Sequence, residues 1–259
     1  MDHRKMLIAM MAAFFVLWVV IPLILPGAGY AIAMATLPFR LLGVFVHEMG
    51  HGLFTLLSGG RFLWFQMDTT GGVAVTSGGF RIFTLLGGLL APALCGAVLL
   101  QASTRARSMK WSLWSLTAFF VIGMIYMIKP IFIGWGQGWS PIYLVSMILP
   151  GAAAFITVKI IKMSDTIQRG WVQFLGILMC YSGFSDTHYI FRYEPLPNNM
   201  FSDARAFAGL FWTGPENVPY LIFLIAAIFI SVLNIGLMAW GVHRAFKTGN
   251  TINSGRLPG

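Results

Sequence analysis

Charged side chains are scarce in this sequence. Asp, Glu, Lys and Arg make up 10% of its 259 residues, and only eight residues are acidic. A soluble domain of this size carries a much larger charged fraction on its surface. Hydrophobic residues account for 58% of the chain, the mean hydropathy is +0.78, and apolar runs of about twenty residues recur along it. The scarcity of charge therefore excludes a soluble domain and indicates a polytopic membrane protein.

Cysteine is also rare, and acidic residues are outnumbered by basic ones. The two cysteines, Cys95 and Cys180, lie in apolar runs, where packing residues are expected and a disulfide framework is not. The net charge of +9 is spread over short loops and the two ends of the chain. This distribution is typical of anchoring at the surface of a lipid bilayer and excludes a nucleic-acid-binding surface.

The apolar runs predict an all-α polytopic membrane protein with about six to seven transmembrane helices. We expect a single integral membrane domain over residues 1–259. The short apolar segment 27–38 is either a re-entrant or surface helix or the lower part of the next span. The predicted spans cover residues 6–25, 39–57, 82–102, 111–128, 140–158, 170–185 and 219–240.

Residues 61–80 differ from the rest and predict a short β-hairpin. Aromatic and β-branched residues such as Phe62, Trp64 and Val73 favour strands, and the run 68–72 (Asp-Thr-Thr-Gly-Gly) is typical of a turn. An exposed strand edge can bind an extended peptide by adding it to the sheet as a further strand. The alternative is a plain connecting loop.

The loop charges divide the predicted loops between two faces. Basic residues cluster at 105–110, at 159–169 and after 243, and seven spans place these three clusters on one face. The positive-inside rule makes that face cytoplasmic, but Arg4 and Lys5 indicate the opposite orientation. The absolute orientation of the chain in the membrane therefore stays open. In either orientation, the hairpin and the loop after residue 186 lie on the same face.

The clearest indication of a chemical function lies in the predicted motif helix, residues 39–57. The run Val46-His47-Glu48-Met49-Gly50-His51-Gly52 contains a His-Glu-x-x-His motif. On a helix, His47 and His51 lie one turn apart and point the same way, so both can bind one Zn²⁺. Glu48 then lies beside the metal and can act as the catalytic general base.

Two observations make a chance match to this motif improbable: the composition of the chain and the apolar setting of the motif. With five His and three Glu in the chain, chance produces the pattern roughly once per thousand such sequences. Three ionisable side chains in an apolar helix cost free energy unless a function uses them. The alternative is a buried polar cluster that forms hydrogen bonds between helices.

A catalytic zinc usually has three protein ligands, so a third ligand is expected. We choose Asp186 in the region 170–190, because it is the acidic residue closest to a predicted span on the hairpin face. His188 is the second choice, and it can instead orient the carboxylate or contact the substrate. Asp203 is a weaker candidate, because it follows Ser202, the expected N-cap of a short helix over residues 202–210.

These features together resemble a known family. A His-Glu-x-x-His motif within a span, followed by Ser58-Gly59-Gly60-Arg61 and a hairpin, is similar to the motif helix of the site-2 proteases and its exit. The Gly/Pro-containing run 87–99 and the downstream run Ser202-Asp203-Ala204 are similar to segments of the small bacterial branch without a PDZ domain. The resemblance covers about half of the chain.

The resemblance implies His47 and His51 as zinc ligands, Glu48 as the general base and an aspartate from a later span as the third ligand. We therefore expect an intramembrane zinc metalloendopeptidase of the bacterial cytoplasmic membrane, with a transmembrane protein as substrate and a role in regulated intramembrane proteolysis. The alternatives are a catalytically silent relative, a membrane metal-binding or transport protein, and a different zinc membrane protease that admits soluble or prenylated peptides.

Overall fold

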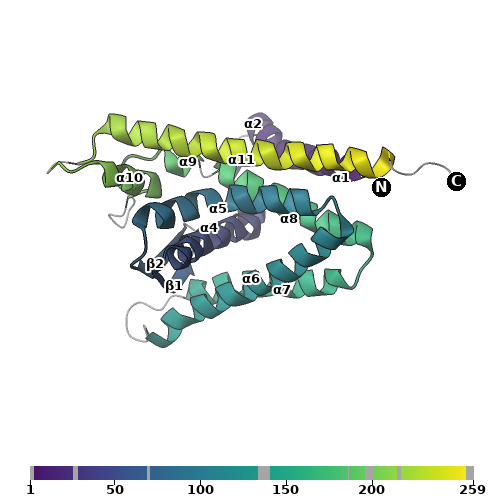
Figure 1. Cartoon of the computed structure of the whole chain (residues 1–259), viewed down its shortest axis with the longest axis horizontal. Coiled ribbons are helices and arrows are strands. Elements are labelled where there is room, and N and C mark those ends of the chain that lie inside the picture. The colour runs from purple at the N-terminus through teal and green to yellow at the C-terminus, as the bar shows by residue number, and fades with distance from the viewer. Residues whose placement is uncertain are drawn as a thin grey trace.

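The computed structural model describes residues 3–25, 29–68, 71–133, 141–185, 187–195, 201–214 and 217–254. It is mostly helical and contains one small antiparallel hairpin (Figure 1). The helices are α1 (His3–Phe15), which continues through a π-helical turn into α2 (Ile21–Ile24), α3 (Gly29–Ala35), α4 (Leu37–Leu57), α5 (Arg81–Ala102), α6 (Ala106–Ile133), α7 (Pro141–Ile161), α8 (Asp165–Ser185), α9 (Thr187–Ile190), α10 (Asp203–Ala208) and α11 (Tyr220–Ser254). The strands are β1 (Arg61–Met67) and β2 (Gly72–Ser77).

Four helical stretches in the described part of the chain are long and apolar enough to cross a membrane. They are His3–Ile24, Arg81–Ala102, Ala106–Lys129 and Tyr220–Lys247. The predicted helical architecture and the hairpin after the motif helix are confirmed. The count of six to seven spans stays a prediction.

Helix α4 carries the motif and packs closely on α5 through small residues. A Cβ atom on Gly87 would lie 2.7 Å from the carbonyl oxygen of Gly50, so the two backbones are in contact there. Gly43 brings α4 equally close to α8, because a Cβ at this position would overlap the side chain of Ser182. Glycine is required at such crossings, since any side chain would separate the helices.

The hairpin follows α4 directly, because Gly59 ends the helix with a φ of +83°, a conformation that glycine adopts without strain. Strand β1 buries Phe62 and Phe65. The Phe65 ring packs on Phe45 of α4, and the Phe62 ring stacks on Tyr126 of α6. These contacts hold β1 against the helices and leave β2 beside the motif.

Helix α10 lies against the first turns of α5 and α11 (Figure 1). Ser202 caps it as predicted, since its hydroxyl oxygen accepts a hydrogen bond of 3.3 Å from the backbone N–H of Arg205. A second hydrophobic cluster joins the three helices through Leu89, Ala204 and Phe223. The segment after residue 186 therefore returns to the hairpin end of the molecule, as the loop arrangement predicted.

Candidate metal centre

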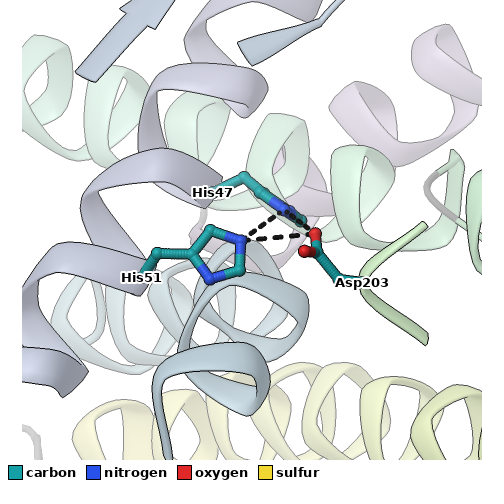
Figure 2. Close-up of side chains that lie close together, drawn as sticks. All are labelled: His47, His51 and Asp203. Carbon is teal, nitrogen blue, oxygen red and sulfur yellow. Dashed lines mark hydrogen bonds and ion pairs between the residues drawn. The ribbon is translucent and has the colours of Figure 1, made fainter. Parts of the chain in front are cut away.

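The two histidines of the motif lie on one face of α4 and point toward α10. Both are buried, at 8% exposure for His47 and 7% for His51. Their Nε2 atoms are 3.1 Å apart. Figure 2 shows both rings directed at the same point, as the spacing of one helical turn predicted.

Asp203 completes this group from a position 152 residues beyond His51. Its Oδ2 atom lies 3.0 Å from Nε2 of His47 and 3.3 Å from Nε2 of His51 (Figure 2). One ligand atom from each residue lies within 4.8 Å of the others, and no second group of this kind occurs among the described residues. Two histidines and one carboxylate form a common donor set for a catalytic zinc.

The hydrogen bonds of His51 show that the three donors fit a metal ion. Nδ1 of His51 donates to the carbonyl oxygen of Thr84, at 2.8 Å, so the proton of a neutral His51 is on Nδ1. The Nε2 atom of the neutral ring presents a lone pair toward the Oδ2 atom of Asp203, so a contact of 3.3 Å needs either a second proton on His51 or a metal ion between the two atoms. The three separations of 3.0 to 3.3 Å match the distance of about 3.3 Å between ligands of a tetrahedral zinc.

Tyr189 of α9 holds the Asp203 carboxylate in place. Its hydroxyl group donates to Oδ2 at 3.4 Å and accepts from the backbone N–H of Asp203 at 3.2 Å. Burial raises the pKa of the Tyr189 phenol, and the Asp203 charge raises it further, so the phenol keeps its proton at neutral pH. Burial would also raise the pKa of Asp203, but His51 and His47 hold it below its usual range, so Asp203 is ionised.

Glu48 is buried at 4% exposure and lies beneath the hairpin. Its carboxylate accepts a hydrogen bond from the backbone N–H of Ala74 on β2. A Cβ atom on Gly72 would lie 2.6 Å from both Cγ and Oε1 of Glu48. The hairpin therefore fixes the position of this carboxylate, and glycine at residue 72 leaves room for it.

The structure brings together His47, Glu48 and His51 of the motif with Asp203, the candidate that the sequence ranked below Asp186. Asp186 and the side chain of His188 lie outside the described residues, so their roles stay predictions. Sequence reasoning missed three supporting residues, Tyr189, Thr84 and Ala74. Two of them act through backbone groups, which no residue type reveals.

One family model matches most of the chain. The model of the Peptidase M50B-like family covers residues 7–240, which include α4, the hairpin and Asp203. No curated protein and no solved structure matches the chain.

Proposed function

The chain belongs to the Peptidase M50B-like family, which is a site-2 protease family, and on this basis we propose that it is an intramembrane zinc endopeptidase. It hydrolyses a peptide bond within or near a transmembrane segment of another protein. The observation that carries the proposal is the convergence of His47, His51 and Asp203 beside the buried carboxylate of Glu48.

In this proposal His47, His51 and Asp203 hold the zinc ion. Thr84 fixes the tautomer of His51, and Tyr189 orients Asp203, so each of these two ligands has a partner that sets its direction. A bound zinc would supply Lewis-acid polarisation of a peptide carbonyl and would lower the pKa of a water molecule.

Glu48 is the general base. It accepts a proton from the attacking water and transfers it to the amine nitrogen of the leaving segment. The N–H of Ala74 holds the carboxylate in one orientation, and its burial keeps bulk water away from it. Because Glu48 adjoins His47 in the sequence, its position relative to the zinc ligands is set by α4.

The edge of β2 that does not pair with β1 is suited to bind an extended substrate. In the described part of the chain the sheet has two strands, so β2 pairs with β1 on one edge only. A helical substrate hides its carbonyl groups in backbone hydrogen bonds and must unwind before attack. An unwound segment can pair with β2 as a third strand and pass beside Glu48.

The contact between Gly72 and Glu48 gives a first prediction. Gly72→Ala should reduce the turnover number about 10- to 100-fold, because the added methyl group displaces the general base. Zinc content should not change, since Gly72 contacts no proposed ligand. The measurement is cleavage of labelled single-span peptides by the purified, reconstituted protein.

Gly71→Ala is the matched control, because a Cβ atom on Gly71 would contact nothing within 4 Å. It places the same methyl group one residue away and should cleave at the wild-type rate. Equal losses in both variants would attribute the effect to the hairpin turn and not to Glu48.

Metal analysis of the purified protein tests the proposed function. We expect about one zinc per chain in the wild type, loss of zinc in His51→Ala and Asp203→Ala, and retention of zinc in Asp186→Ala. Cleavage should disappear with a chelator and return with zinc. Zinc retained in Asp203→Ala but lost in Asp186→Ala would return the third-ligand role to Asp186.

The same measurements separate the alternatives. One zinc per chain without cleavage of any peptide would favour a catalytically silent relative. A transport protein would need successive metal sites, and the described residues contain one cluster of this kind. No zinc in a folded, freshly purified wild type would overturn the enzyme proposal.

A further inference from the structure

A cationic cavity of about 310 Å³ lies where α10, the first turn of α5 and the segment before α11 meet. Two arginines, Arg81 and Arg205, line it together with Phe201, Asn217 and apolar groups. No carboxylate among the described residues lines this space, and neither do the proposed zinc ligands. The cavity is therefore a separate site with positive charge.

Arg205 is the buried cation of this cavity. It is 6% exposed, and its guanidinium carbon lies over the ring of Phe201, at 3.8 Å from the centroid, and over the ring of Tyr193, at 4.3 Å. Its Nη1 atom donates to the carbonyl oxygen of Tyr193 at 2.6 Å, and Nη2 donates to Oδ1 of Asn217 at 3.4 Å. A guanidinium has five N–H donors, so three remain for a ligand in the cavity.

The charge of Arg205 has no carboxylate partner among the described residues. A buried cation that no carboxylate of the described residues neutralises favours an anion in the cavity. Arg81, the exposed first residue of α5, adds a second cation. The planar guanidinium matches the oxygen atoms of a phosphate group, which can accept two parallel hydrogen bonds from it.

Lipid phosphates are expected where membrane spans begin, and the cavity lies beside the start of two candidate spans. Two candidate membrane spans, Arg81–Ala102 and Tyr220–Lys247, both begin at its rim. Exposed apolar side chains follow on the first turns of these helices, among them Phe83 on α5 and Leu221 and Ile225 on α11. A headgroup in the cavity would thus have apolar protein surface beside its acyl chains.

We propose that this cavity binds the phosphate group of an anionic phospholipid, with the acyl chains along α5 and α11. A zwitterionic lipid would bring its own cation toward Arg81 and Arg205, and like-charge repulsion would weaken its binding. The proposal concerns lipid recognition and stands independently of the peptidase activity. It can therefore be tested without a substrate.

The test is native mass spectrometry of the delipidated full chain, titrated with phosphatidylglycerol, with phosphatidylcholine or with inorganic phosphate. We expect one tightly bound phosphatidylglycerol per wild-type chain and binding of phosphatidylcholine at least about tenfold weaker. Arg81→Gln should weaken phosphatidylglycerol binding about tenfold, because a charge-assisted hydrogen bond is lost. Arg61→Gln is the control, since Arg61 is exposed at the start of β1 and does not line the cavity.

Arg205→Lys is the second variant, because it keeps the charge but loses the planar guanidinium that contacts both rings. It should also weaken binding, and Arg81→Gln keeps the test valid if Arg205→Lys does not fold. Equal affinity for the two lipids, or unchanged binding in Arg81→Gln, would overturn the proposal. Inorganic phosphate bound as tightly as the lipid would identify a free-phosphate site instead.

Discussion

Glu48→Gln is expected to retain zinc and to lower the rate of peptide cleavage by about three orders of magnitude. Glutamine fills the same buried space beneath β2 and can still accept the N–H of Ala74 with its carbonyl oxygen. It cannot take a proton from water at neutral pH. The loss should therefore fall on the turnover number, whereas substrate affinity stays close to the wild-type value.

The control for Glu48→Gln is its metal content. Equal zinc in variant and wild type, together with equal thermal stability, would restrict the effect to proton transfer. A Glu48→Gln protein that cleaves within a factor of ten of the wild type would remove Glu48 from the mechanism. Loss of zinc in this variant would instead show that Glu48 supports the metal site.

The helices were predictable because each depends on a run of apolar residues that are close together in the sequence. Long apolar runs gave the span predicted at 82–102, which is observed as α5 (Arg81–Ala102), and the motif helix predicted at 39–57, which is observed as α4 (Leu37–Leu57). The strand-forming residues after Gly59 gave the hairpin. The last helix was predicted to end at Trp240 but continues to Ser254, because helical geometry extends into the polar turns that hydropathy excludes.

The third member of the candidate metal centre was harder to predict. A helix fixes the spacing of His47 and His51, but the approach of Asp203 depends on how α10 packs against α5 and α11. Hydropathy favoured an acid at the end of a span, whereas Asp203 reaches the motif from the polar segment between spans. Its helix-start position and its proposed role as a ligand are compatible, since Ser202 provides the cap and leaves the Asp203 side chain free to face the histidines.

Gly88→Ala should weaken zinc binding by about 10- to 100-fold or more. A Cβ atom at this position would overlap the imidazole of His51 at Nε2, the atom proposed to bind the metal. The ring cannot turn away freely, because Nδ1 is tied to the carbonyl oxygen of Thr84. The measurement is zinc affinity from competition with a fluorescent chelator, with cleavage falling in parallel.

Gly236→Ala is the matched control, because Gly236 lies in α11 and a Cβ atom there would contact nothing within 4 Å. Alanine favours a helix over glycine by about 1 kcal/mol, so this control should be as stable as the wild type or more stable. If the Gly88 effect acts through His51, Gly88→Ala should lower the thermal stability of the wild type but cause no further loss in His51→Ala, because the smaller side chain leaves room for the added methyl group. A further loss in the double variant would show that Gly88 acts on the packing of α5 against α4. Losses in the double variant that equal the sum of the two single losses would assign the Gly88 effect to the contact between α5 and α4. A smaller combined loss would assign it to the position of the His51 ring.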